Sequence, residues 1–129
     1  MNVKRIVPVG RSMNEREDTL RNLALNDERV ITSILATGMD TWNASCIDAR
    51  THALVRLGAL IALDAPVVSY QSCITMALAA GATSDDIVDT LIAVAPIAGE
   101  VRLVAAAPAL ALAIGYDIDA ALEAYNDSL

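Results

Sequence analysis

Three ionisable side chains of this 129-residue chain have the types and spacing that proton transfer on an anionic molecule needs. His52 and Arg56 are four residues apart, so in a helix they share one face, with Asp48 at the start of the same stripe. An imidazole transfers protons near neutral pH, and a guanidinium binds carboxylates. Glu100 stands between two strongly apolar segments, where burial would raise the pKa of its carboxyl or require a charged partner. We therefore take His52, Arg56 and Glu100 as candidate catalytic residues.

Each of these residues also has a purely structural interpretation. A stripe containing His52 and Arg56 is typical of a solvated face or of a contact between subunits. Glu100 in the exposed first turn of a helix would be favoured there by the helix dipole. Both interpretations remain open at this point.

A second group of residues could form the wall of a ligand cavity. Ser69 lies one helical turn before Cys73, so both side chains can face the same space, and Tyr70 could line it or a subunit contact. The alternatives are a local hydroxyl bond for Ser69 and burial of Cys73 as a small apolar side chain. One histidine and two separated cysteines give no metal-ligand pattern, so we expect no metal and no cofactor.

Caps and helix breakers predict an all-α chain, because no run alternates with the period of a buried strand. Pro66 suits the first turn of a helix that ends at Gly81, and the residues from Thr83 to Asp86 form a strong start signal for the next. After Arg56 the preceding helix is apolar all round, which predicts burial on every side. The expected helices begin at Met13 and end at Gly38 with a break at Asn26 and Asp27, and then span residues 48–63, 66–81, 84–95 and 100–114, the last kinked at Pro108, with a final helix capped by Asp117 or Asp119.

Length and composition limit the range of partners. We expect residues 1–129 to form one domain, with residues 1–12 as an N-terminal arm or a frayed end and Trp42 anchoring a connecting loop. Apolar residues make up 55% of the chain and aromatic residues only 3%, which predicts Ala-rich helices that associate as a homo-oligomer. A net charge of −7 with scattered basic residues argues against nucleic acid. No segment has the length and composition of a membrane span or of an export signal, so we expect a cytoplasmic protein.

The order of motifs from Asp48 to Asp117 resembles the carboxymuconolactone decarboxylase and alkylhydroperoxidase-D family. DARTH precedes an apolar helix, a second helix ends in AAGAT, acidic residues cap a third, and an Ala-rich helix ends in GYD. The resemblance covers about half of the chain. It implies an all-helical fold, assembly as a trimer or hexamer, and decarboxylation of a small carboxylated metabolite.

The residues that carry chemistry in this family are replaced here. Counting back from the AAGAT motif, the resemblance places the peroxidase cysteine pair at Pro66 and Ser69 and the family histidine at Cys73. The family glutamate falls at Ala53 or Leu54. Disulfide exchange needs two thiols within reach, so peroxidase chemistry of the family type is not expected. Three hypotheses follow, in this order: a decarboxylase-like enzyme, a non-catalytic small-molecule-binding or scaffold homo-oligomer, and a redox protein that uses Cys73.

Overall fold

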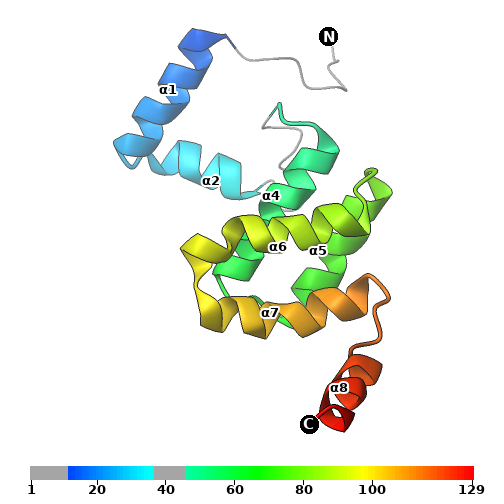
Figure 1. Cartoon of the computed structure of the whole chain (residues 1–129). Helices are drawn as coiled ribbons and strands as arrows, with labels where there is room; N and C mark the ends of the chain where they lie inside the picture. The colour runs from blue at the N-terminus through cyan, green and yellow to red at the C-terminus, as the bar shows by residue number, and fades with distance from the viewer. Residues whose placement is uncertain (1–11, 37–45) are drawn as a thin grey trace. The chain divides into compact units, whose positions relative to one another are not determined.

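A computed structural model of the chain describes residues 12–36 and 46–129, which are helical and contain no strand (Figure 1). The all-α prediction is confirmed for these residues. The expected N-terminal arm and the loop with Trp42 lie outside them. The chain divides into two compact units, residues 1–48 and 49–129, which we describe separately.

The described part of the first unit is a pair of helices, α1 (Met13–Ala24) and α2 (Glu28–Ala36). The Ser12 hydroxyl accepts a hydrogen bond from the Glu15 amide at 3.2 Å and caps α1. Between the helices, the predicted break is confirmed: Asn26 has a φ of 58°, and the Asp27 carboxylate accepts from the Arg29 amide at 3.0 Å. Neither helix contains a buried residue.

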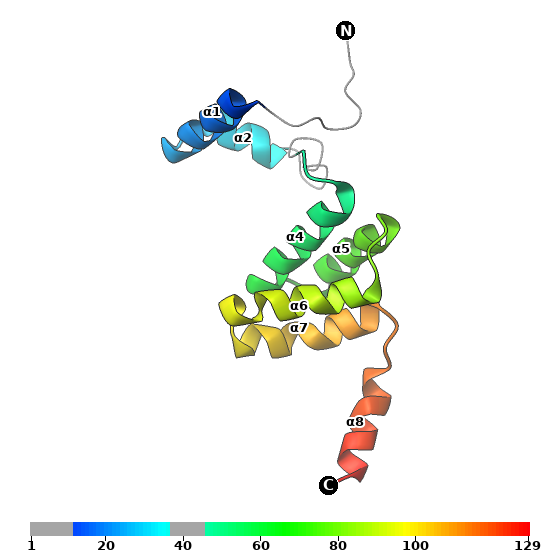
Figure 2. The ribbon, with the colours of Figure 1, turned by 45° about the horizontal axis from the view of Figure 1, so that its top comes forward.

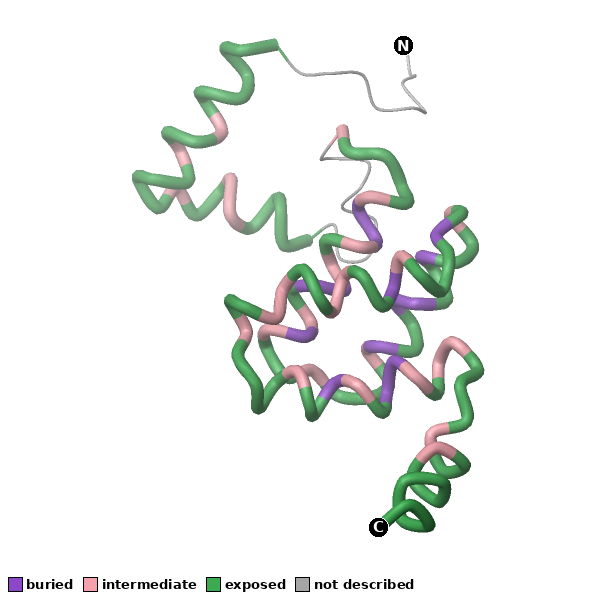
Figure 3. The backbone as a smooth tube through the Cα atoms, viewed as in Figure 1, coloured by how far each residue is buried: buried purple, intermediate pink, exposed green. Residues whose placement is uncertain are grey.

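The second unit contains five helices: α4 (Ala49–Ala62), α5 (Val67–Ala79), α6 (Ser84–Ala98), α7 (Glu100–Ala113) and α8 (Ile118–Asp127). The first four surround the core of the unit (Figures 1 and 2). Helix α5 packs against α4 and α7, and α6 packs against the same two helices. The most deeply buried large side chains are Leu57, Ile61, Ile74 and Ile87, and Figure 3 shows the buried positions concentrated where these helices face one another.

The local start and stop signals set most of these boundaries. Thr83 and Asp86 form a capping box at the start of α6, with the two reciprocal bonds at 3.1 and 2.8 Å. At the start of α8, the Asp117 carboxylate accepts from the Ala120 amide at 3.0 Å, so Asp117 rather than Asp119 is the cap. Where we expected a helix to end near Ala95, α6 instead continues through Pro96, since a proline in the last turn removes only one backbone hydrogen bond.

Gly99 joins α6 directly to α7. It is at once the C-cap of α6 and the N-cap of α7, with φ 87° and ψ 165°. Residues with a Cβ rarely adopt this backbone conformation, whereas glycine reaches it without strain. The two helices are therefore connected by a single residue.

The expectation that the chain after Arg56 is buried on every side is wrong for a single copy of the protein. Leu57 and Ile61 are fully buried, but Leu63 is 76% exposed and Ala59 is also exposed. Helix α4 packs against α5, α6 and α7 over part of its surface, and its remaining apolar face has no partner in the described residues of this unit.

No single helix in the described residues is both long and apolar enough to cross a membrane. Helices α7 and α8 together meet such a length and composition test, but as a pair bent by 120°.

Candidate functional site

The packing of α5 on α4 is fixed by two side chains of α5 that bond to backbone carbonyls of α4. The Tyr70 hydroxyl donates to the Leu60 carbonyl at 3.1 Å, and the Cys73 thiol donates to the Ala53 carbonyl at 3.4 Å. Both donors are almost fully buried, with 3% and 2% of their surfaces exposed. These bonds hold α5 against α4 at Tyr70 and Cys73.

His52 lies on α4 beside this contact and is buried, with 8% of its surface exposed. Its pKa is lowered, first because burial disfavours the charged imidazolium and second because the Arg56 guanidinium repels it. The predicted stripe therefore runs from exposed Asp48, through buried His52, to half-buried Arg56. Of the two structural interpretations, a fully solvated stripe is wrong, because its central residue lies inside the unit.

The Cys73 thiol is held in its protonated form. Burial raises its pKa, and the Arg56 guanidinium opposes this effect more weakly. The Arg56 guanidinium thus affects the pKa of both His52 on α4 and Cys73 on α5. The arrangement can bind a negative group at the guanidinium and exchange a proton at the imidazole.

The family positions inferred from the sequence are also neighbours in space. The resemblance assigns the family histidine to Cys73 and the family glutamate to Ala53 or Leu54, and the thiol of Cys73 bonds to the carbonyl of Ala53. His52 immediately precedes Ala53 on α4. The imidazole of His52 therefore precedes, by one residue, a position at which the resemblance places the family glutamate.

The other predicted residues occupy different surroundings. Ser69 is half-buried in the first turn of α5, where its amide donates to the Pro66 carbonyl at 3.0 Å. Burial raises the pKa of Tyr70, whose hydroxyl is already engaged by Leu60. Glu100 is exposed in the first turn of α7, as its structural interpretation predicted, and is not among the charges that shift the pKa values of His52 and Cys73.

A cavity of about 260 Å³ lies elsewhere in this unit, between α6, α7 and the connection to α8. It is lined by Val88, Leu91, Ala107, Leu110, Ala111, Ile114 and Tyr116. Ser69, Tyr70 and Cys73 do not line this cavity, so their role as a cavity wall stays a prediction. The sequence offered no signal for the cavity beyond the small residues of α7.

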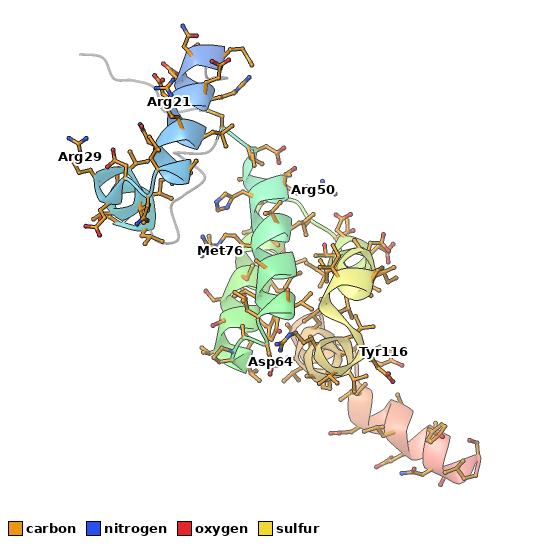
Figure 4. The ribbon with its side chains drawn as sticks, turned by 90° about the vertical axis from the view of Figure 1, so that its left-hand side faces the viewer. Arg21, Arg29, Arg50, Asp64, Met76 and Tyr116 are labelled. Atoms are coloured by element: carbon orange, nitrogen blue, oxygen red, sulfur yellow. The ribbon has the colours of Figure 1, made fainter. Side chains whose placement is uncertain are left out.

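An ion pair between α4 and α6 could not be predicted from the sequence. The Arg50 guanidinium lies 2.8 Å from the Asp86 carboxylate and joins the first turn of α4 to that of α6. Figure 4 shows Arg50 at this end of α4. The Thr83 amide and Arg50 together lower the pKa of Asp86. Within residues 12–36 and 46–129, no three His, Cys, Asp or Glu side chains come close enough to hold a metal ion.

Comparison with known proteins gives one result. The sequence model of the carboxymuconolactone decarboxylase family matches residues 31–112. No curated protein and no solved structure matches the chain. The matched residues include the whole of α4, α5 and α6 and nearly all of α7, which carry the site, and they make up more than half of the sequence. This chain therefore belongs to the carboxymuconolactone decarboxylase family.

Proposed function

We propose that this protein is a carboxymuconolactone decarboxylase-like enzyme that acts on a small carboxylated metabolite. The observation that carries the proposal is the position of Arg56, whose charge acts on both His52 and Cys73 at the buried contact of α4 with α5. Arg56 would bind a substrate carboxylate, and His52 would transfer the proton. Family membership supports the reaction class.

The chemistry requires one proton for each CO2 released. Loss of CO2 breaks the carbon–carbon bond to a carboxylate and leaves the electron pair on the substrate, where a conjugated carbonyl accepts it as an enolate. A proton is then added to carbon, and the enolate collapses to the product. The His52 imidazolium would donate this proton and recover one from water, while Arg56 would stabilise the negative oxygen.

The low pKa of His52 suits this role once substrate is bound. Burial and the Arg56 charge lower the pKa of His52 and so favour the neutral imidazole. A carboxylate placed at Arg56 would offset the positive charge and raise the pKa of His52. Substrate binding would thereby favour protonation of the group that must deliver the proton.

The remaining candidates take secondary roles in this proposal. Cys73 and Tyr70 would form the wall behind the substrate on α5, with Ser69 at its rim. Glu100, which is exposed at the start of α7, would contribute if a neighbouring subunit covered that end of the helix. Its contribution is tested separately from that of His52 and Arg56.

The test is CO2 release from a panel of small lactone and keto carboxylic acids. On a substrate that the wild type turns over, His52→Gln should lower kcat by about 100-fold or more, the usual size of an acid–base contribution. Arg56→Gln should mainly raise KM. Arg29→Gln, which removes an exposed guanidinium from the other unit, is the matched control. Wild-type rates in both His52→Gln and Arg56→Gln would refute the assignment, and the same assay on Glu100→Gln decides the part of Glu100.

A second function, a non-catalytic small-molecule-binding or scaffold homo-oligomer, is favoured by a different observation. The helices of the second unit leave large apolar side chains exposed, among them Leu63 at 76% and Val101 at 82%. Surfaces of this kind usually mark contacts with another protein. Assembly as a trimer or hexamer, as the resemblance implies, would cover them. Binding of a small carboxylic acid without turnover of any member of the panel would favour this function over the first.

A further inference from the structure

The α6–α7 cavity, of about 260 Å³, takes no part in the proposed reaction. None of the residues that line it carries a charge, and nearly all of the lining atoms are apolar. The candidate catalytic residues His52, Arg56 and Glu100 are not part of its wall. It is therefore a second concave site in the same unit, with a chemistry unlike that of the α4–α5 contact.

The packing of α7 keeps this cavity from closing. Ala107 and Ala111, one turn apart on α7, contribute only methyl groups to the wall. On the same helix, Ala106 and Leu110 are 1% and 3% exposed in the close-packed core, so α7 cannot move toward α6 without displacing them. Gly99 joins the two helices without a spacer. The cavity is therefore preformed, as sites for small molecules usually are.

The opening of the cavity disfavours negatively charged molecules. The wall residues Val88 and Tyr116 are 42% and 56% exposed, so the cavity can be entered from the surface, and Figure 4 shows Tyr116 near the end of α7. Asp85 precedes Val88 by one helical turn, and Asp117 directly follows Tyr116. These carboxylates repel an approaching anion, and the apolar wall offers no partner to a charge inside the cavity.

We propose that the α6–α7 cavity binds a small, uncharged, apolar molecule. An apolar protein cavity of about 150 Å³ binds benzene, so about 260 Å³ accommodates about ten carbon atoms, the size of a bicyclic aromatic compound. Water competes poorly for this space, because it finds few hydrogen-bond partners there. The inference goes beyond the proposed decarboxylation, whose substrate is an anion bound at Arg56, and does not depend on it.

The experiment is an NMR titration of the isotope-labelled full chain with indole, an uncharged bicyclic aromatic molecule. Indole should shift the backbone amides of Leu91, Ala107 and Ala111 with one dissociation constant of about 1 mM or below, an ordinary value for so small a ligand. Indole-2-carboxylate adds a negative charge to the same rings and should bind at these amides at least about tenfold more weakly. Ala107→Met fills the cavity and should weaken indole binding by about tenfold or more. Ala105→Met makes the same change at an exposed position of α7 outside the cavity and should leave the affinity within about twofold of wild type.

Three outcomes would overturn the inference. The first is that saturating indole leaves the amides of Leu91, Ala107 and Ala111 unmoved. The second is that Ala105→Met weakens binding as much as Ala107→Met, and the third is that the carboxylate binds at these amides as tightly as indole. Ala111→Leu is a second cavity-filling variant in case Ala107→Met does not fold, and circular dichroism shows which variants retain their helices. Indole binding is measured without turnover, so its failure is distinguishable from failure of the proposed activity.

Discussion

The Cys73 thiol on α5 donates a hydrogen bond to the Ala53 carbonyl on α4, with 3.4 Å between sulfur and oxygen. The family resemblance places a histidine at Cys73 and a glutamate at Ala53 or Leu54, so the contact joins Cys73 to one of the two candidate glutamate positions. None of these positions carries a histidine or a glutamate, and His52 lies next to Ala53 in the sequence.

The pKa of His52 should lie below the ordinary value of 6.5, because the imidazole is buried and Arg56 repels its charged form. The chain has a single histidine, so its C2 proton gives an unambiguous NMR titration. Arg56→Gln should move the measured pKa upward, and an anionic ligand bound at Arg56 should do the same. A wild-type pKa at or above 6.5 would contradict the burial seen in the structure.

The same shift makes stability depend on pH. Since the folded-state pKa of His52 is below the unfolded value, the unfolded chain binds more protons as the pH falls. The free energy of unfolding should therefore be greatest above pH 6.5 and decrease as the pH falls through 6.5 toward the folded pKa. Urea titrations of the wild type and His52→Gln should diverge in this window. Parallel curves would show that His52 titrates alike in both states.

Cys73 should resist alkylation in the native protein. Its thiol is 2% exposed and burial raises its pKa, so little thiolate is available. In Cys46→Ser, where only Cys73 remains, iodoacetamide should react far more slowly in buffer than in urea, as mass spectrometry would show. Rapid native labelling would instead revive the redox hypothesis for this residue.

Tyr70→Phe should destabilise the protein by about 1 kcal/mol, the usual net value of one hydrogen bond. The loss should be modest because the Leu60 carbonyl also accepts from the Ala65 amide at 3.1 Å. Tyr125→Phe, at an exposed position of α8, is the matched control for chemical denaturation. An unchanged midpoint in Tyr70→Phe would mean that water replaces the hydroxyl.

Asp86 should support stability only above its own titration range. The Thr83 amide and Arg50 hold its pKa below 3.8, so its contribution is fully present above pH 3.8 and is lost as the pH falls through the folded pKa. Asp86→Asn should remove this acid-sensitive part, whereas Asp85→Asn, at the exposed neighbouring position, should not. The comparison needs thermal unfolding between pH 2.5 and 5; equal curves for both variants would exclude the mechanism.

The sequence predicted what depends on neighbouring residues along the chain. The start signal from Thr83 to Asp86 and the stop at Gly81 are local signals that appear where expected, and of the two caps expected for the last helix, Asp117 and Asp119, the structure uses Asp117. The pairing of Arg50 with Asp86 was not predictable, because it depends on how α4 meets α6. For the same reason the sequence left open whether the stripe of His52 and Arg56 faces solvent, whereas His52 is buried in the structure.

Gly99 places a constraint on chain length at the α6–α7 junction. Because one residue ends α6 and begins α7, there is no spacer that could absorb an insertion. Each residue added there would rotate α7 by about 100° about its axis. Ala106, Ala109 and Leu110 would leave the core together, and the part of the cavity wall that α7 contributes would turn with them. Length variation should therefore be tolerated at other connections of this unit before it is tolerated here.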